Sequence, residues 1–324
     1  MLLDKRVAFK PNEYDVFYKL GKLVVKTHWH DELMDFITDK QQFHNELTET
    51  ERYIIGTILK TFAQTETVVM DEFWGHVHNF IPKPEFKVMA YTFAENECRH
   101  AEAYDRLSTE LGLSDYHSFL EDEVAKERLE NLTKIKIENG ENPNIVDLAR
   151  TFAIFGGGCE NVALFAQFAI MLSFSQRGLL SDLGTVIAWS QKDETLHAIS
   201  AMTTFNILLE EYPDKVTREE IKDDILDGLL TTYRIEVDLV KQIFAKGSLP
   251  NIDEESVVEM MKDRVNQSLT FMKFEPHFEV NKEIIKKLDW FVSESFGLEM
   301  TDFFWSKPVE YTMGETQYNA SSLF

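Results

Sequence analysis

Two segments of this 324-residue chain share the spacing Glu-x-x-His, and this repeat constrains the fold more than any other feature. They are residues 97–100 (Glu-Cys-Arg-His) and residues 194–197 (Glu-Thr-Leu-His), and each lies in an apolar stretch typical of a helix. Residues three apart share one face of a helix, so each segment can direct a carboxylate oxygen and an imidazole nitrogen to a common point. Each segment is therefore a candidate half of a metal site.

An isolated acidic residue in apolar surroundings precedes each segment. Glu66 lies 31 residues before Glu97, and Glu160 lies 34 residues before Glu194. A charged carboxylate in such surroundings must be paired, coordinated to a cation or neutralised. Both separations match the length of a helical hairpin. The pattern indicates a helix carrying one Glu followed by a helix carrying Glu-x-x-His, twice along the chain.

Together these positions predict a site for two metal ions. The candidate ligands are Glu66, Glu97, His100, Glu160, Glu194 and His197. Four carboxylates and two neutral imidazoles carry four negative charges, which balance two divalent cations, and such ligands suit iron or manganese. The pattern resembles that of the ferritin-like dimetal carboxylate proteins. That resemblance implies an all-α, ferritin-like helical bundle with the dimetal site in its four-helix core and additional helices around it.

Gly and Pro are sparse and separate the apolar periodic stretches, so nearly all of the chain is predicted to be helical. The expected helices cover residues 43–78, 87–112, 145–176, 183–211, 216–246, 254–276 and 281–298. No boundary supports a split into two domains. We expect residues 1–300 to form a single ferritin-like domain and residues 301–324 to form a C-terminal segment and flexible tail.

Charge and cysteine content exclude several classes of protein. The formal net charge is −23 and the basic residues form no stripe, so nucleic acid is not an expected partner. Residues 152–174 are apolar enough for a membrane span, but they include a Glu, an Asn, a Gln and three consecutive glycines, which favours a buried central helix. Cys98 and Cys159 show no motif spacing, and residues 1–6 lack the apolar segment of a signal peptide, so none is expected. A reduced, cytoplasmic protein is expected.

Tyr104 lies four positions after His100, one helical turn further on, and should face the metals. A phenol in this place suits one-electron oxidation by an oxygen-activated metal pair, which would leave a tyrosyl radical in a water-poor site. The alternative is a core tyrosine whose hydroxyl bonds a metal-bound carboxylate. The residue alone leaves both interpretations open.

From about residue 20 to the C-terminus the chain is similar to the small, radical-generating subunit of class I ribonucleotide reductase. The matching features are the six candidate ligands, Tyr104, and residues 192–197, where the family has a basic residue, Asp-Glu, two spacers and His. Trp29 lies 37 residues before Glu66, where the family has a tryptophan that passes electrons toward the metals. Asp193 would accept hydrogen bonds from Trp29 and His100 and so link the indole to the metals.

The resemblance implies a function shared between two subunits. An oxidised dimetal-carboxylate centre, of manganese, iron or both, would supply a radical or oxidising equivalent to a large catalytic subunit that reduces ribonucleotides to deoxyribonucleotides. It further implies a homodimer. An activase or flavoprotein is an additional candidate partner.

The C-terminal residues resemble the part of the family that reaches the large subunit. Residues 303–311 match the segment whose tyrosine, Tyr311 in this chain, relays the radical across the subunit interface, although Tyr318 is an alternative relay. The last dozen residues are small and polar until Leu323 and Phe324, a pair of apolar side chains that suits a groove on the large subunit.

Two positions depart from family members that keep a stable tyrosyl radical. The first ligand is Glu66, where many members have Asp, and position 164 is Leu, where much of the family has Phe. Some relatives with Glu at the first position keep the oxidising equivalent on manganese/iron or manganese pairs. Storage on Tyr104 and storage on the metals therefore both stay open, and oxygen and imidazole ligands do not identify the metals.

Three other functions are compatible with the sequence. A two-metal oxidase or hydroxylase would share the ligands. It would need a substrate pocket, and it should have no docking tail. A ferritin-type storage protein would usually be a shorter chain that assembles into a shell. A metal-free helical interaction protein would bind no stoichiometric metal.

Overall fold

The structure is a computed structural model that describes residues 1–113, 121–135 and 144–291. This part of the chain is helical and contains no β-strand, only an isolated bridge between Leu249 and Ile252. The α-helices are α1 (Asp15–Lys26), α2 (Ile37–Asn45), α3 (Glu49–Val69), α4 (Gly75–Val77), α5 (Pro84–Glu110), α6 (Glu123–Lys134), α7 (Ile145–Ile154), α8 (Phe165–Ser175), α9 (Ser181–Glu211), α10 (Arg218–Ile243), α11 (Glu254–Phe271) and α12 (Lys282–Ile285). The predicted all-α class is confirmed for the described residues.

Two π-helical segments interrupt the long helices. Met70–Trp74 joins α3 to α4, and Phe155–Ala163 joins α7 to α8. Short 3-10 turns also occur at Asp31–Leu33 and Lys286–Leu288. A π segment inserts one extra residue per turn and often marks a functional site, because it changes which side chains face a given neighbour.

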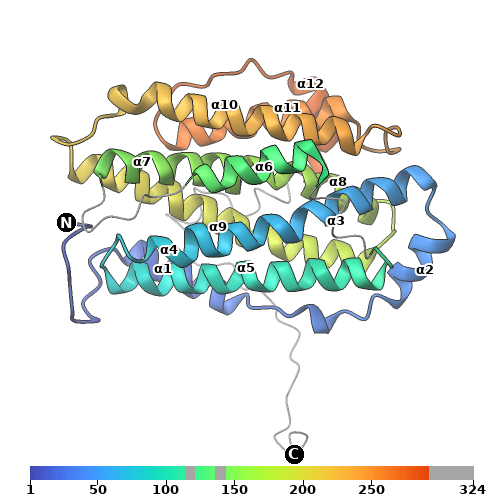
Figure 1. Cartoon of the computed structure of the whole chain (residues 1–324), viewed down its shortest axis with the longest axis horizontal. Helices are drawn as coiled ribbons and strands as arrows, with labels where there is room; N and C mark the ends of the chain where they lie inside the picture. The colour runs from blue at the N-terminus through green and yellow to red at the C-terminus, as the bar shows by residue number, and fades with distance from the viewer. Residues whose placement is uncertain (114–120, 136–143, 292–324) are drawn as a thin grey trace, which may run out of the picture.

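The long helices lie roughly side by side (Figure 1). Helix α3 packs against α5, and α1 packs along the outer side of α5. The segment Phe155–Ala163 is surrounded by α7, α9, α10 and α11. Because α5 contacts α3 and α9, and α9 contacts Phe155–Ala163, these four elements lie around the middle of the bundle.

One stretch within the described residues, Ile145–Ser175, has the length and apolar composition of a membrane span. Of its most apolar window, 94% is buried inside the bundle. Side chains of α8 from Phe165 to Phe174 are buried on every side of the helix. A helix that is apolar all round belongs in the interior of a large helical protein, and the prediction of a buried central helix is confirmed.

The first predicted helix boundary is wrong. A single helix over residues 43–78 is expected from the sequence, but α2 ends at Asn45 and α3 begins at Glu49. Thr48 breaks the helix because it is the N-cap of α3. Its hydroxyl accepts from the Glu51 N–H, and the Glu51 carboxylate accepts from the Thr48 N–H. This reciprocal arrangement satisfies two N–H groups that the start of a helix otherwise leaves unpaired.

Other differences concern short elements. The helix expected at residues 281–298 is only the four-residue α12 and a 3-10 turn as far as residue 291, and its remaining residues lie outside the described part. The sequence pattern does not predict α1 or α6, each of which has 12 residues. Both pack one side against longer helices, so tertiary contacts stabilise them more than their own length does.

Helix α6 is held in place by a buried arginine. Arg128 donates hydrogen bonds to Thr65 Oγ1 of α3 and to Glu236 Oε1 of α10. Gln167 Nε2 donates to the other oxygen of Glu236 at 3.0 Å. A buried ion pair of this kind needs such additional hydrogen bonds to offset the cost of removing both charges from water. The network fixes α3 one residue before Glu66.

A glycine allows the close approach of Phe155–Ala163 to α9. A Cβ atom added at Gly156 would lie 2.6 Å from Ala201 Cβ and 3.1 Å from Met202 N, so Gly156→Ala forces two helices apart. We expect this variant to lower the free energy of unfolding by about 1–3 kcal/mol, as overpacked cores do. Urea denaturation measures the change.

Gly56→Ala on α3 is the matched control. Its added Cβ would meet only Leu113 Cδ2, at 3.5 Å, together with Cδ1 at 3.9 Å, which is ordinary contact. Alanine is the better helix former by up to about 1 kcal/mol, so this variant should be neutral or stabilising. Equal stability of the two variants would contradict the close approach at Gly156.

Candidate metal centre

The six candidate ligands come from the four elements that enclose the middle of the bundle. Glu66 projects from α3, the segment 97–100 from α5, Glu160 from Phe155–Ala163, and the segment 194–197 from α9. All six side chains are at most 1% exposed. The two Glu-x-x-His segments and the two isolated glutamates, which are far apart in the sequence, thus meet in one buried place.

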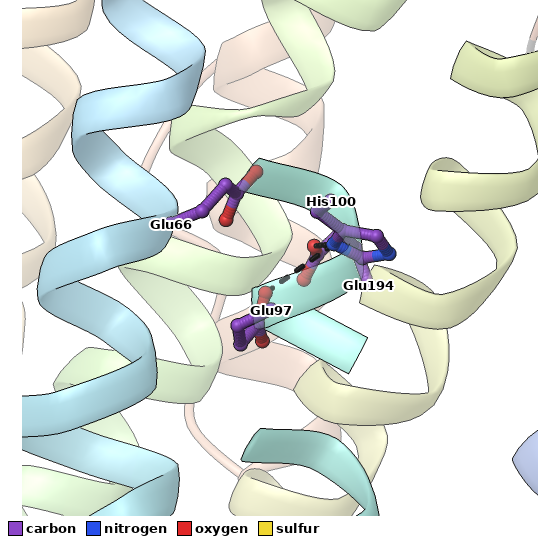
Figure 2. Close-up of side chains that lie close together, drawn as sticks. All are labelled: Glu66, Glu97, His100 and Glu194. Carbon is purple, nitrogen blue, oxygen red and sulfur yellow. Dashed lines mark ion pairs between the residues drawn. The ribbon is translucent and has the colours of Figure 1, made fainter. Parts of the chain in front are cut away.

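These side chains form two overlapping groups. Glu66, Glu97, His100 and Glu194 can each place a ligand atom within 4.8 Å of the others (Figure 2). The second group consists of Glu97, Glu160, Glu194 and His197, within the same limit. Glu97 and Glu194 belong to both groups. Two groups of candidate ligands that share two carboxylates are the arrangement expected for a pair of metal ions.

The donor atoms fit a pair of cations. Both oxygens of Glu66 and Oε2 of Glu160 are buried and have no hydrogen-bond donor within the described residues, whereas Glu97 and Glu194 face the imidazole nitrogens of the two histidines. His100 Nδ1 lies 2.9 Å from Glu194 Oε1, and His197 Nδ1 lies 2.8 Å from Glu97 Oε1. Buried carboxylate oxygens without a donor are costly unless they coordinate a cation. Oxygen and imidazole donors suit iron and manganese.

Protonation of the cluster follows from burial and from crowding of like charges. Burial, together with the charges of Glu194 and Glu97, raises the pKa of Glu66 and of Glu160 well above the ordinary value. Burial opposes a charged imidazole, but the charges of Glu97 and Glu194 outweigh it and raise the pKa of His197 to about 9. Divalent cations would displace these protons, so metal uptake should release protons and weaken as the pH falls.

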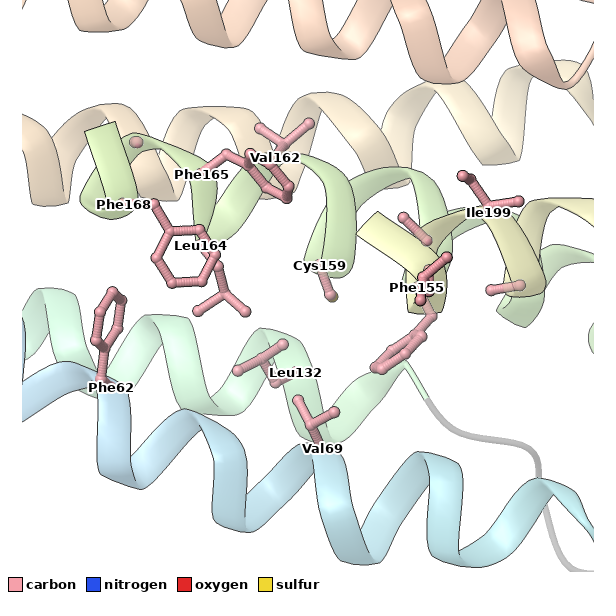
Figure 3. Close-up of a cluster of buried hydrophobic side chains, with 14 of the residues drawn as sticks. Phe62, Val69, Leu132, Phe155, Cys159, Val162, Leu164, Phe165, Phe168 and Ile199 are labelled. Carbon is pink, nitrogen blue, oxygen red and sulfur yellow. The ribbon is translucent and has the colours of Figure 1, made fainter. Parts of the chain in front are cut away.

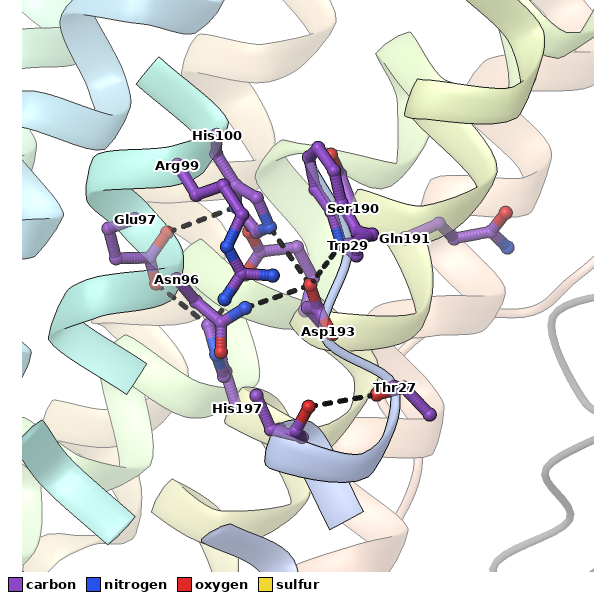
Figure 4. A network of polar contacts seen from close by, with 12 residues as sticks. Thr27, Trp29, Asn96, Glu97, Arg99, His100, Ser190, Gln191, Asp193 and His197 are labelled. Atoms are coloured by element: carbon purple, nitrogen blue, oxygen red, sulfur yellow. Dashed lines mark hydrogen bonds and ion pairs between the residues drawn. The ribbon is translucent and has the colours of Figure 1, made fainter. Parts of the chain in front are cut away.

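Asp193 connects the site to the N-terminal part of the chain (Figure 4). Its Oδ2 accepts hydrogen bonds from Trp29 Nε1 at 2.9 Å and from Asn96 Nδ2 at 2.9 Å, and it lies 3.3 Å from His100 Nε2. The rings of Trp29 and His100 are stacked, with centroids 5.7 Å apart and planes at 14°. The Arg99 guanidinium covers Trp29 at 5.3 Å from the ring centroid. The contacts expected of Asp193 are therefore present.

Tyr104 is buried beside the first group. Its ring centroid lies 6.3 Å from that of His100 and 4.7 Å from that of Phe62. No carboxylate within the described residues accepts a hydrogen bond from its hydroxyl, and the Ser190 side chain lies near it. Burial raises the pKa of Tyr104 well above its ordinary value, and the charge of Glu66 acts in the same direction. Leu164, at the position where much of the family has Phe, lies in an apolar cluster with Phe62 (Figure 3).

Comparison with known proteins identifies the family. The family model for the small chain of ribonucleotide reductase matches residues 6–284, which is most of the chain. The chain belongs to this family. Membership makes it a subunit of an oxidoreductase, and proteins of this family bind a dimetal centre.

Relatives and solved structures agree with this assignment. A probable small subunit of ribonucleoside-diphosphate reductase from Invertebrate iridescent virus 3 is 26% identical over 96% of this chain and 85% of its own length. The R2 subunit of Clostridium botulinum ribonucleotide reductase has a TM-score of 0.76 at 18% identity, covering 87% of this chain and 89% of its own. The dimanganese(II) NrdF of Streptococcus sanguinis has a TM-score of 0.74 at 14% identity, covering 88% and 100%. The predicted ferritin-like bundle of the R2 type is confirmed.

Two residues near the site are not predicted from the sequence. Trp74, from the π segment Met70–Trp74, donates from Nε1 to Glu160 Oε1 at 2.8 Å. Asn96 donates to Asp193 and is also fully buried. Asn96 stands beside the ligand Glu97 in the sequence, which is a usable signal. The sequence around Trp74 contains no such signal, because regular helical spacing does not predict a π segment.

Tyr311, Tyr318 and the rest of the expected tail lie outside the described residues.

Proposed function

We propose that this member of the ribonucleotide reductase small chain family generates the oxidising equivalent that its large catalytic subunit uses to reduce ribonucleotides to deoxyribonucleotides. The observation that carries the proposal is the pair of overlapping buried groups that share Glu97 and Glu194. A storage protein or an interaction protein needs no such pair linked by hydrogen bonds to a tryptophan. The link through Asp193 to Trp29 supports a path that brings electrons to the centre.

The proposed ligands divide into two halves with a common bridge. Glu66 and His100 would hold one cation and Glu160 and His197 the other, and Glu97 and Glu194 belong to both groups of candidate ligands. These ligands would hold a manganese or iron pair, whose chemistry when bound would be one-electron oxidation, with oxygen or a reduced oxygen species as the oxidant. The protein contributes a buried pocket and fixes the tautomer of His100, because His100 Nε2 faces Asp193 and leaves Nδ1 for the cation.

We further propose that Trp29 passes electrons toward this centre, to which the hydrogen bonds of Asp193 link it, and that Tyr311 carries the radical to the large subunit. Asp193 contacts both Trp29 and His100, and the rings of Trp29 and His100 are stacked, which supports the proposed electron path through Trp29. The proposed role of Tyr311 rests on the resemblance of residues 303–311 to the corresponding segment of the family. The assembly is a homodimer in the cytoplasm that binds the large subunit through residues 301–324, with residues 1–300 as one domain. An activase or flavoprotein is a proposed additional partner.

The oxidising equivalent is proposed to stay on the metals in this protein. Oxidation of a phenol to a neutral radical requires its proton to leave for an acceptor, and no carboxylate within the described residues accepts a hydrogen bond from the Tyr104 hydroxyl. Its raised pKa also opposes loss of the proton before oxidation. Glu66 in place of the Asp of many relatives points in the same direction. Tyr104 is then a core residue that packs against Phe62 and His100 and excludes water from the Glu66–His100 half of the site.

Low-temperature electron paramagnetic resonance tests the proposed function. We expect protein isolated from its natural source to contain two metal ions per chain and to give a signal of coupled metal ions, which Tyr104→Phe leaves in place because the phenol does not hold the radical. Metal content is determined on the same sample. A narrow organic-radical signal that Tyr104→Phe abolishes would move the oxidising equivalent to Tyr104. Absence of any stoichiometric metal would overturn the proposed function itself.

A further inference from the structure

The two halves of the site differ in how their outer glutamates are held. Both oxygens of Glu66 are without a hydrogen-bond partner within the described residues. In Glu160 only Oε2 is without one, because Oε1 accepts a hydrogen bond from Trp74 Nε1 at 2.8 Å. Trp74 has no exposed surface, so water does not compete for this hydrogen bond. The halves are therefore unequal before any cation binds.

Trp74 is aimed at Glu160 by the backbone of the π segment. The Gly75 N–H donates to Met70 O, five residues earlier, which closes the wide turn. A Cβ atom added at Gly75 would lie 2.6 Å from that same oxygen, so this position requires glycine. Without the extra residue of the π turn, the side chain at position 74 would point in another direction around the helix axis.

Aromatic neighbours hold the indole ring on its other sides. Phe73 and Phe93 lie edge-on to Trp74 with centroids 4.9 and 4.8 Å away, and Phe155 lies at 6.0 Å. The ring of His197 is 5.5 Å away. A ring packed in this way cannot turn to another acceptor without disturbing its neighbours. Its N–H is a fixed donor toward one oxygen of one ligand.

We propose that Trp74 is a positioning residue that holds Glu160 Oε1 and so fixes the orientation in which Glu160 would meet a cation. This inference rests on the proposed function, because it assigns a role to a residue that acts through a metal ligand. The Glu160–His197 half then depends on Trp74, whereas the Glu66–His100 half does not. A hydrogen bond to a ligating carboxylate fixes its orientation, and removing such a partner typically weakens metal binding about 10- to 100-fold.

Manganese(II) binding to the metal-depleted protein tests the role of Trp74. Free Mn²⁺ is followed by its electron paramagnetic resonance signal, which gives the number of bound ions and the affinity of each. We expect wild type to bind two ions, and Trp74→Phe to bind one of them about tenfold or more weaker while the other is unchanged. Trp290→Phe, the same substitution at a half-buried tryptophan away from the ligands, should match wild type.

A double-mutant cycle separates positioning from a general loss of packing. If Trp74 acts through Glu160, then adding Trp74→Phe to a Glu160→Ala background should leave the affinity for the remaining ion unchanged. If Trp74 only maintained the packing of the site, the double variant would bind the remaining ion more weakly than Glu160→Ala alone. Gly75→Ala, which displaces the π turn, should reproduce the weakening seen with Trp74→Phe although the indole is still present.

An isosteric replacement keeps the test valid if Trp74→Phe does not fold. Incorporation of β-(3-benzothienyl)alanine at position 74 keeps the shape of the indole and replaces only its N–H by sulfur, and the same selective weakening is expected. Two ions bound with wild-type affinities in this variant would overturn the role of Trp74 and leave the proposed function standing. Failure of wild type to bind Mn²⁺ stoichiometrically would overturn both.

Discussion

Glu194→Ala should lose both metal ions, whereas Glu66→Ala should retain one. Glu194 belongs to both buried groups, and it also lies 2.9 Å from His100 Nδ1 and 3.1 Å from His197 Nδ1. Glu66 belongs to the first group only. Removing a shared carboxylate takes one negative charge and one ligand from each cation position, while removing an outer one spares the other position. Metal content after loading with manganese and iron and gel filtration measures the difference.

Glu102→Ala is the matched control for this experiment. Glu102 lies on α5 close to the ligand segment, but its side chain is exposed. It should keep both ions, so any loss in Glu194→Ala is not a general effect of removing an acidic side chain. Full occupancy in Glu194→Ala would remove this residue from the ligand set, and equal losses in the Glu66 and Glu194 variants would contradict the shared position of Glu194.

The sequence predicts the centre of the site because its geometry is local. Three-residue spacing on a helix brings a Glu and a His to one face whatever the rest of the chain does, and the segments 97–100 and 194–197 meet as that spacing requires. The acids Glu66 and Glu160 are detectable because apolar surroundings make an isolated carboxylate costly. Asp193 was also expected to contact Trp29, and it does.

Other parts depend on contacts that spacing does not encode. Trp74 reaches Glu160 only because the chain adopts a π turn, and α6 is held by Arg128 through partners on α3 and α10. Such helices and turns are stabilised by tertiary packing, not by the propensity of their own residues. The break at Thr48 had a local signal, the capping pair with Glu51, but the apolar periodicity around it concealed the boundary.

Deletion of the last ten residues should abolish ribonucleotide reduction and leave the metal centre intact. Residues 315–324 lie outside the described part of the structure, and their sequence is small and polar until Leu323 and Phe324. A mostly polar segment that ends in two apolar side chains suits a groove on a partner. None of the candidate ligands lies in it, so metal content and the electron paramagnetic resonance signal should match wild type. Turnover is measured with the large subunit from the same source.

The double variant Leu323→Ala/Phe324→Ala distinguishes docking from the radical relay. Burial of one large apolar side chain contributes about 1.5–3 kcal/mol, so losing both anchors should weaken subunit binding by at least tenfold. Because the relay candidates Tyr311 and Tyr318 are retained, turnover should recover when the large subunit is raised to saturating concentration. In the ten-residue deletion, which also removes Tyr318, full recovery at saturation would leave Tyr311 as the only relay. Tight binding by the double variant would instead show that the terminal pair is not the anchor.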